Sequence, residues 1–340
     1  MNGLDGEEYM VTYLITGATG YIGSQIIKTL IGSDAYKQGE LKIITHCRNV
    51  EKYKGMYANI DDKNTYPLFS DIKDIKNIVN VAAQEGCLGN IDYIIHCAAN
   101  TTSSIMISNP VETIDGIVQG TKSVLELAKE MNIKGMVYLS SMEVYGDITC
   151  TPDNRATEDM LGFIDILKSR SSYPLGKRMA EGYCVAYAKE YGVPVKIARL
   201  AQTFGKGILA NENRSFAQFV RAAAEGRDIV LKTEGKSIGN SVAIEDAVDA
   251  IFFLLENGEN GQAYNVVNEN NTMSIKEMAE LVAHSIGRDK TKVVIDIEDS
   301  SKTGYAADTS LYMSGEKLRQ LGWEAMKGIE EMFFDVYNSI

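Results

Sequence analysis

A glycine-rich turn near the start of the chain limits what the sequence can fold into. Residues 10–23 read MVTYLITGATGYIG: an apolar strand, three glycines at three-residue spacing, and the start of an amphipathic helix. In such a turn Gly17 permits the tight bend, Gly20 lets the backbone approach a pyrophosphate, and Gly23 lets the helix pack close to its strand. The pyrophosphate would lie on the first amide groups of a helix predicted over 22–31. A glycine triplet alone also fits an ordinary strand–helix turn, but the flanking strand and helix favour nucleotide binding.

The bulk properties narrow the class of protein. With 340 residues, of which 45% are hydrophobic and 24% charged, the chain can form one large or two medium domains. The net charge of −12 argues against a nucleic-acid or membrane partner, because either would need a basic face. The first residues are polar and acidic and no apolar run reaches the length of a membrane span, so we expect a cytoplasmic protein.

The cysteines and histidines predict neither disulfides nor a metal site. The cysteines are five, scattered, and without a C-x-x-C pair, as is typical of reduced thiols. They are Cys47, Cys87, Cys97, Cys150 and Cys184. Three histidines leave little scope for binding a metal, so we expect none.

Strands and helices alternate through the first part of the chain, which predicts an α/β fold with a Rossmann-type, doubly wound parallel sheet. The predicted strands are Val11–Thr16, Leu41–Cys47, Tyr93–Ala98, Gly135–Ser140 and Val195–Leu200. The predicted helices are Ile22–Ile31, Ile75–Glu85, Pro110–Met131 and Pro174–Tyr191.

The later part of the chain is less regular and predicts a smaller C-terminal α/β lobe. Its predicted helices are Arg214–Glu225, Ile244–Leu255, Ser274–Ile286 and Ser314–Leu321, and its short strands are Ile229–Lys232, Ala263–Val266 and Val293–Ile297. We expect a dinucleotide-binding domain over 1–205, to which 238–265 returns. Residues 206–237 and 266–340 would form the substrate-binding lobe.

Tyr173 and Lys177 lie four residues apart at a predicted helix start, and therefore on one helix face. A nearby ammonium and a cationic nicotinamide would favour the phenolate form of the tyrosine, which could then remove a hydroxyl proton. The same spacing occurs on solvated helix faces. The chain order favours catalysis here, because the glycine turn and the strand-ending pair Ser140-Ser141 both precede the tyrosine and lysine.

This order resembles the extended short-chain dehydrogenases/reductases, the branch of NAD(P)-dependent nucleotide-sugar epimerases, dehydratases and decarboxylases. The resemblance covers nearly the whole chain. The segments that carry it are Thr16–Gly23 (T-G-A-T-G-x-I-G), Asp71-Ile72 (the adenine-contacting D-[IV]), His96–Ala99 (H-x-A-A), Ser140–Gly146 (S-[ST]-x-x-V-Y-G), Arg199–Gly205 (R-x-x-N-x-[YF]-G) and Leu321–Trp323 (L-G-W).

The resemblance implies specific catalytic roles. Tyr173 is then the acid/base, Lys177 tunes it and holds the nicotinamide ribose, and Ser141 bonds the reacting hydroxyl or carbonyl. Glu143 is either catalytic or a polar wall of the sugar pocket. The family's 4,6-dehydratases place an aspartate before this glutamate; Met142 stands there instead, and a thioether cannot donate a proton. Dehydration is therefore disfavoured.

The resemblance also implies the residues that bind the cofactor. They are Gly17, Thr19, Gly20, Tyr21, Ile22, Gly23, Arg48, Asp71, Ile72, Ala98, Ala99 and Lys177. NAD-preferring members carry an acidic residue at the end of the second strand for the ribose diol. Residues 44–49 contain no acid, and Arg48 could bind a 2′-phosphate, so we expect NADP in preference to NAD. A solvated arginine is the other explanation.

Three positions depart from the family pattern. Ile117 stands where the family has the asparagine of N-V-x-G-T, and Gln202 replaces that of R-x-x-N. Gly239 takes the place of the arginine that clamps the diphosphate of the sugar nucleotide, so an ordinary UDP-sugar site would be weakened. The candidates to compensate are Arg214, Lys232 and Lys302, and we expect Gln202 and Arg214 to contact substrate.

The sequence therefore predicts a nucleotide-sugar epimerase that works by hydride and proton transfer at a sugar hydroxyl or ketone. A keto-sugar-nucleotide reductase that consumes NADPH, a decarboxylase-like member and a non-catalytic dinucleotide sensor are the alternatives. We expect a homodimer built from the helices over 110–131 and 174–191. The second of these helices carries an apolar stripe formed by Met179, Tyr183, Ala186 and Tyr191, with Tyr187 beside them. The alternative is that this stripe packs inside its own subunit.

Overall fold

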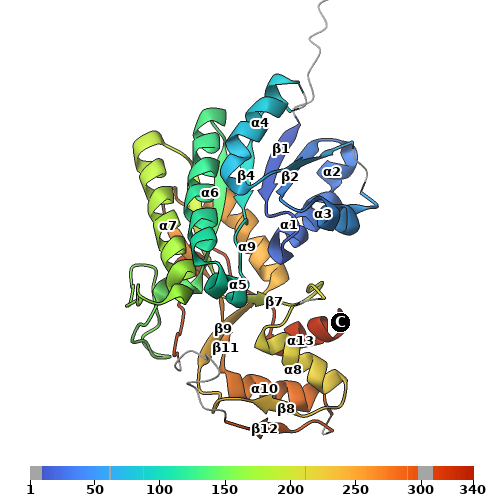
Figure 1. Cartoon of the computed structure of the whole chain (residues 1–340), viewed down its shortest axis with the longest axis vertical. Coiled ribbons are helices and arrows are strands. Elements are labelled where there is room, and N and C mark those ends of the chain that lie inside the picture. The colour runs from blue at the N-terminus through green and yellow to red at the C-terminus, as the bar shows by residue number, and fades with distance from the viewer. Residues whose placement is uncertain (1–9, 61–62, 87, 211, 289, 298–308) are drawn as a thin grey trace, which may run out of the picture. The chain divides into compact units, whose positions relative to one another are not determined.

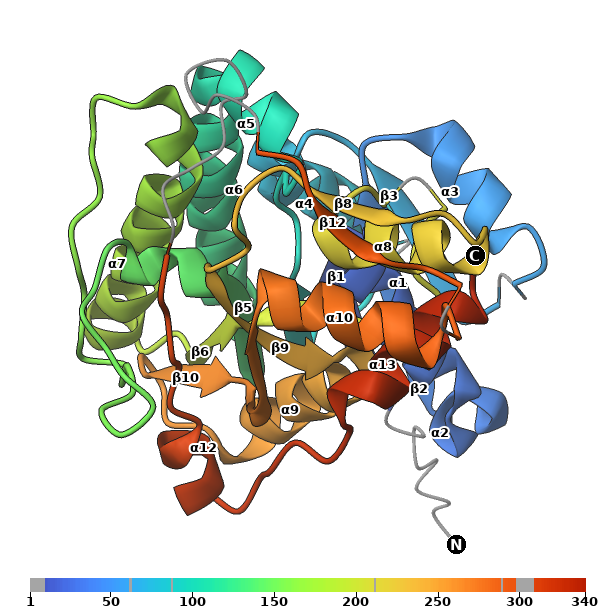
Figure 2. The same cartoon turned by 90° about the horizontal axis from the view of Figure 1, so that it is seen from below.

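The computed structural model describes residues 10–60, 63–86, 88–210, 212–288, 290–297 and 309–340 (Figures 1 and 2). The chain divides into two compact units. Unit 1 consists of the residues up to Ser140, Asp165–Ile197 and Leu254–Gln262. Unit 2 consists of Ser141–Ile164, Ala198–Phe253 and Ala263–Ile340. That the cofactor binds to one domain and the substrate to the other remains a prediction.

A seven-stranded sheet with the order β10-β6-β5-β4-β1-β2-β3 confirms the predicted fold class. Its strands are β1 (Val11–Thr16), β2 (Leu41–Cys47), β3 (Thr65–Phe69), β4 (Tyr93–His96), β5 (Gly135–Ser141), β6 (Val195–Leu200) and β10 (Ala263–Val266). β1 pairs in parallel with both β2 and β4, and β4 pairs in parallel with β5. The strand order reverses beside β1, the switch point where such sheets bind ligands.

Helices connect the strands of unit 1. They are α1 (Tyr21–Gly32), α2 (Asp34–Gln38), α3 (Val50–Tyr57), η1 (Ile72–Asp74), α4 (Ile75–Gln84), α5 (Ser103–Ser108), α6 (Pro110–Met131), η3 (Ser169–Ser171) and α7 (Ser172–Tyr191). Figure 1 shows α6 and α7 side by side. A Cβ on Gly176 would lie 3.3 Å from Ile117 Cδ1, so the glycine lets these helices approach closely.

Unit 2 contains short strands and helices. Its strands are β7 (Gln202–Phe204) and β9 (Ile238–Ala243), which pair in one small sheet with β11 (Asn268–Ser274), and β8 (Ile229–Leu231), which pairs with β12 (Val293–Ile295). Its helices are η2 (Met142–Tyr145), α8 (Ser215–Ala224), α9 (Ile244–Asn257, whose end belongs to unit 1), α10 (Ile275–Ser285), α12 (Glu316–Gln320) and α13 (Ile329–Tyr337). Figure 2 shows α8, α10 and α13 clustered together. Phe204 stacks on Phe216 with ring centroids 4.3 Å apart, and Phe333 packs on Phe204, which forms the aromatic core of this cluster.

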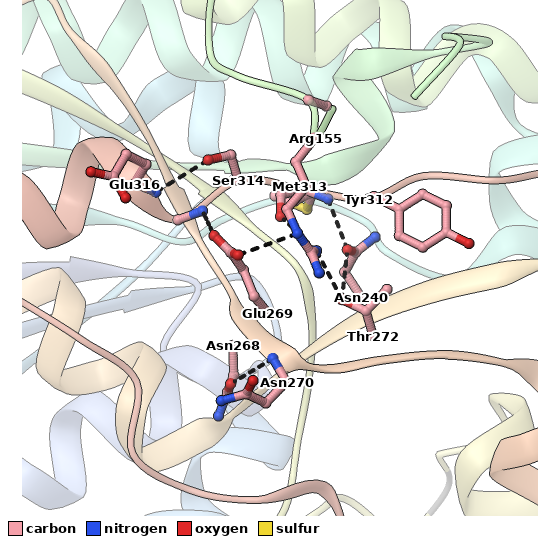
Figure 3. A network of polar contacts seen from close by, with 12 residues as sticks. Arg155, Asn240, Asn268, Glu269, Asn270, Thr272, Tyr312, Met313, Ser314 and Glu316 are labelled. Carbon is pink, nitrogen blue, oxygen red and sulfur yellow. Dashed lines mark hydrogen bonds and ion pairs between the residues drawn. The ribbon is translucent and has the colours of Figure 1, made fainter. Parts of the chain in front are cut away.

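A network of polar contacts holds the segment over 309–315 in unit 2 (Figure 3). The fully buried Asn240 donates to Leu311 O at 2.6 Å and accepts from Met313 N at 2.9 Å. Arg155 donates to Met313 O at 3.3 Å and pairs with Glu269 at 3.2 Å. Because buried backbone groups must be paired, this network fixes a segment that forms no extended ladder of its own.

The structure confirms most of the predicted elements with small shifts. β1, β2, β6, β10 and α6 have the predicted bounds. β4 ends at His96 and not at Ala98, because Ala98 N turns to Thr16 Oγ1, 3.3 Å away, and leaves the ladder. Elements that the sequence analysis missed are α2, α3, β3, η1, α5, η2, η3, β7, β9, β11 and α13.

The described residues contain no helix that is long and apolar enough to cross a membrane. Within the same ranges, no three His, Cys, Asp or Glu side chains gather as a metal site would require. Cys47, Cys97, Cys150 and Cys184 are free thiols, while Cys87 and Lys302 lie outside the described residues.

Candidate active site

The glycine turn after β1 has the geometry that its sequence predicts. Gly17 has a φ of +70°, and a Cβ there would lie 2.9 Å from Ala98 N. A Cβ on Gly23 would lie 2.4 Å from Gly17 O, so this glycine lets α1 pack against the turn. Gly20 caps α1 with extended backbone. The turn therefore presents bare backbone at a helix N-terminus, which fits the pyrophosphate of a dinucleotide.

A helix that the sequence analysis missed supports this turn. Tyr57, the last residue of α3, donates from its hydroxyl to Ala18 O at 2.5 Å. On the other side of the same residue, Ala18 N donates to His46 O at 3.0 Å. Burial raises the pKa of Tyr57 well above its ordinary value, so the hydroxyl remains a donor. Both backbone polar groups of Ala18, inside the turn, are thus held by hydrogen bonds.

Five more of the predicted cofactor residues lie in the turn, at the start of α1 or directly after β4. Thr19 is in the turn, and Tyr21 and Ile22 open α1. Ala98 and Ala99 follow β4, half-buried.

Asp71 lies between β3 and η1, and Ile72 is the first residue of η1. The Asp71 side chain accepts from Lys73 N at 3.0 Å and so caps η1. Ile72 is buried against α6, where a Cβ on Gly120 would come within 2.7 Å of it.

Arg48 follows β2 at the predicted position, but it already has a partner. Its Nη1 lies 3.1 Å from Oε1 of Glu112 in the first turn of α6. Both side chains are more than half exposed, at 62% and 59%. An exposed pair of this kind is weak, so a phosphate could compete for the guanidinium.

His96 is a structural residue at the end of β4. Its Nδ1 lies 2.7 Å from Thr16 Oγ1 and its Nε2 lies 3.1 Å from Thr121 Oγ1, so it connects β1, β4 and α6. Burial, with the Lys177 charge second, lowers the pKa of His96 to about 3. The ring is neutral at physiological pH and fixes the strand end from which Ala98 and Ala99 project.

Tyr173 and Lys177 are both buried on the first turns of α7, at 6% and 4% exposure. Lys177 Nζ lies 5.8 Å from the centroid of the Tyr173 ring and 4.7 Å from that of Tyr138. The same ammonium donates to Leu139 O on β5 at 2.6 Å. Burial lowers the pKa of Lys177 to about 8, and the Glu181 charge opposes that shift. The lysine charge is therefore close enough to the tyrosine to stabilise a phenolate.

Ser141 and Glu143 belong to unit 2, at the end of β5 and in η2. Ser141 Oγ accepts from Glu143 N at 3.2 Å, which caps η2. Both side chains are half-buried. The sequence places Ser141 next to Ser140, whose own side chain lies in unit 1.

Gln202 and two of the candidate cations, Arg214 and Lys232, each have a partner within unit 2. Gln202 pairs with Ser241 in the β7–β9 ladder. Arg214 is paired with Glu212 at 2.6 Å, and Lys232 with Asp296 at 2.8 Å. Among the described residues, a Cβ on Gly239 would meet only Met273 O, at the ordinary contact distance of 3.9 Å, so these residues leave room for a side chain where the family has its arginine.

The comparison with known families agrees with this arrangement. A profile described as "NAD dependent epimerase/dehydratase family" matches residues 13–268. The match includes the glycine turn, Tyr173 and Lys177. The chain belongs to the NAD-dependent epimerase/dehydratase family.

Individual members of the epimerase/dehydratase family are similar to this chain at moderate identity. UDP-glucuronic acid decarboxylase 1 from Danio rerio is 29% identical over 247 residues, which cover 71% of this chain and 53% of the relative. The chain thus spans about half the length of that decarboxylase.

Solved structures of this family share the fold at lower identity. A dTDP-glucose 4,6-dehydratase from Bacillus anthracis in complex with NAD matches with a TM-score of 0.76 and 23% identity, covering 97% of this chain and 96% of the other. A UDP-N-acetylglucosamine 4-epimerase from Methanobrevibacter ruminantium matches with a TM-score of 0.79 and 19% identity, covering 97% and 98%.

One departure from the epimerase/dehydratase pattern has a packing explanation. Ile117, in place of an asparagine, is 2% exposed on α6 and faces Gly176 of α7. An apolar residue here tightens the contact between the two helices, next to the turn of α7 that carries Tyr173 and Lys177.

Proposed function

We propose that this chain is an NAD(P)-dependent nucleotide-sugar epimerase that uses Tyr173 as its acid/base. The observation that carries the proposal is the burial of Tyr173 and Lys177 together, with the ammonium 5.8 Å from the ring centroid. An ammonium at this distance in a site of low dielectric stabilises phenolate over phenol. A bound nicotinamide would accept a hydride from the sugar carbon and return it.

The chain's own residues would move the proton. Tyr173 takes the proton of a sugar hydroxyl as the carbon becomes a ketone, and gives it back when the ketone is reduced on its other face, so the net reaction is an isomerisation. Ser141 would bond the reacting oxygen, and Lys177 would hold the nicotinamide ribose. The glycine turn would hold the pyrophosphate on backbone amides.

A decarboxylase is the second candidate, favoured by the similarity to the Danio rerio UDP-glucuronic acid decarboxylase and by Glu143. Met142, which cannot donate a proton to a leaving hydroxide, favours both candidates over a 4,6-dehydratase.

The test is to incubate the purified chain and NAD or NADP with UDP-glucose, UDP-N-acetylglucosamine and UDP-glucuronic acid in turn. We expect a 4-epimer without net change in cofactor absorbance. Release of CO₂ from UDP-glucuronic acid would replace the epimerase by the decarboxylase, and stoichiometric NADPH consumption with a keto-sugar would replace it by the reductase. If neither cofactor binds, the enzyme proposal fails.

We infer a preference for NADP from Arg48, although a neighbouring structure holds NAD. Because Glu112 neutralises Arg48, its carboxylate would oppose the 2′-phosphate. Arg48→Ala should weaken NADP binding roughly ten- to a hundredfold and leave NAD nearly unchanged. Glu112→Gln should strengthen NADP binding, and titration calorimetry measures both. Equal effects on the two cofactors would remove the NADP assignment.

A homodimer remains our proposal for the assembly. Met179 and Tyr191 are 57% and 45% exposed on α7, and Val111 is 71% exposed on α6, whereas Tyr187 is buried within the chain against Glu126. An exposed apolar face on paired helices is typical of a two-fold interface. Light scattering should give twice the chain mass, and Tyr183→Glu should halve it while Tyr337→Glu on α13 does not. A single-chain mass for the unaltered protein contradicts the dimer.

A further inference from the structure

A buried carboxyl group on α7 has no role in the mechanism described above. Glu181 is 8% exposed, and Ser140 Oγ donates to its Oε1 at 2.5 Å. Glutamate is rarely buried to this extent unless it is paired, because removing a carboxylate from water is costly. The Glu181 carboxylate is therefore held by the groups around it, of which Ser140 is one.

Lys177 lies one helical turn earlier on the same face of α7, so its ammonium is a neighbour of the Glu181 carboxylate. Consecutive residues of β5 hold the two side chains: Leu139 O accepts from Lys177 Nζ at 2.6 Å, and Ser140 Oγ donates to Glu181. The strand thus positions a buried cation and a buried carboxyl beside each other. Tyr173 lies on the far side of the cation, one further turn toward the start of α7.

Apart from Glu181 and the phenolate that Tyr173 would form, the ionisable groups around Lys177 in the described residues do not supply a negative charge. The ionisable residues that face it from β4, β5, α7 and the residue after β4 are His96, Cys97, Tyr138, Tyr173, Glu181 and Cys184. Burial raises the pKa of Cys97 to about 12 and that of Cys184 further, and it raises the pKa of Tyr138, so all three stay protonated at neutral pH. His96 stays neutral, as described above.

We propose that Glu181, held by Ser140, is a positioning residue that keeps Lys177 charged behind Tyr173. This inference rests on the proposed role of Tyr173 as acid/base. The carboxylate offsets the burial of the ammonium, so that Lys177 holds its proton while the tyrosine gains and loses its own. Ser140 keeps the carboxylate in place, and this explains why a buried serine directly precedes Ser141 on β5.

The test measures the ionisation of Lys177 directly. Lysine labelled with ¹³C at Cε is incorporated, the Lys177 signal is assigned by its loss in Lys177→Arg, and its shift is followed with pH by NMR. Glu181→Gln should lower the titration midpoint by at least about one pH unit, because an opposite charge at short range is removed. Glu181→Asp, which keeps the charge, should restore most of the shift. Glu190→Gln, at the exposed end of α7, is the matched control and should leave the midpoint unchanged.

The turnover profile is the second readout. In Glu181→Gln the alkaline limb of kcat should move to lower pH by the same amount, with KM for the sugar nucleotide little changed. An unchanged Lys177 midpoint in folded Glu181→Gln overturns the proposal. If Glu181→Gln does not fold, Ser140→Ala takes its place, with a smaller shift in the same direction expected and no shift overturning the proposal. Because the midpoint needs no substrate, a chain inactive on every nucleotide sugar would refute the proposed function while the titration still decides the role of Glu181.

Discussion

Unit 1 and unit 2 use buried polar side chains of different kinds. In unit 1 they include ionisable groups beside the proposed chemistry: His96, Lys177 and Glu181. In unit 2 they include four asparagines that bond to the backbone of distant segments: Asn240, Asn265, Asn268 and Asn271. An amide satisfies a buried carbonyl or N–H at every pH, whereas a buried histidine or lysine couples folding to protons. The units therefore differ in what their buried polar groups make possible: proton chemistry in unit 1, and fixed loops in unit 2.

The largest effect should come from removing the proton-transfer atom of unit 1. Tyr173→Phe keeps the ring and its packing but lacks the hydroxyl, so turnover should fall at least about a hundredfold. Cofactor affinity and the melting temperature should change little. Steady-state kinetics and calorimetry measure these quantities, with Tyr191→Phe on the exposed end of α7 as the control. Turnover near that of the unaltered enzyme would mean that Tyr173 has no chemical role.

The converse experiment removes from unit 2 one of the side-chain amides that hold a distant backbone segment in place. Asn240→Ala leaves the buried N–H of Met313 and the carbonyl of Leu311 without this partner, which should lower the free energy of unfolding by about 2–3 kcal/mol. The measurement is urea unfolding followed by the fluorescence of Trp323, the single tryptophan, which lies in unit 2. Asn270→Ala, exposed on the neighbouring strand, should have almost no effect. Equal stability of the two variants would show that the amide network of unit 2 does not fix the segment.

The effect that is smallest for each side chain concerns pH. Burial lowers the pKa of His46 to about 4 and that of His96 to about 3, against about 6.5 in an unfolded chain. Below pH 6.5 the unfolded state binds protons that the folded state does not, so stability falls as the pH falls, by at most about 1.4 kcal/mol per pH unit and histidine. Urea unfolding at pH 7 and 5.5 should show this loss. The loss of unfolding free energy between the two pH values should be smaller in His46→Asn, and smaller again in the double variant that also carries His96→Asn. If the double variant loses as much as the unaltered protein, the loss belongs to other groups.

The sequence predicts the strands of the large sheet better than the strands of the two small sheets. The strands of the large sheet other than β3 are mostly apolar runs bounded by turns, so their positions follow from pattern. β3 was missed because its sequence TYPLF contains a proline, which is not typical of a strand interior. β9 and β11 escaped prediction because Gly239, Asn240 and Ser241, and the asparagines of 268–271, are typical of a loop. They form strands since tertiary partners satisfy their amides, such as Lys327 O for Asn271, and no local pattern contains that information.

The candidate site shows the same limit. The spacing of Tyr173 and Lys177 predicted that they share a helix face, and both are buried there. Nothing in the sequence predicted that α3 would place Tyr57 on Ala18 O, or that Arg48 would pair with Glu112, because both contacts join elements distant along the chain. Glu181 had a signal, four residues after Lys177, but its meaning depends on Ser140 being opposite.

The glycines described above differ in how freely evolution or an engineer can replace them. At Gly17 any side chain is excluded twice, by a left-handed backbone and by the approach of Ala98 N, so that position is closed to change. Gly239 has ordinary strand backbone, and a Cβ there would make no contact with the described residues closer than 3.9 Å. A single substitution can place a cation there without rebuilding the strand, so the charge at this position is separable from the fold and can drift while the glycine turn stays constant.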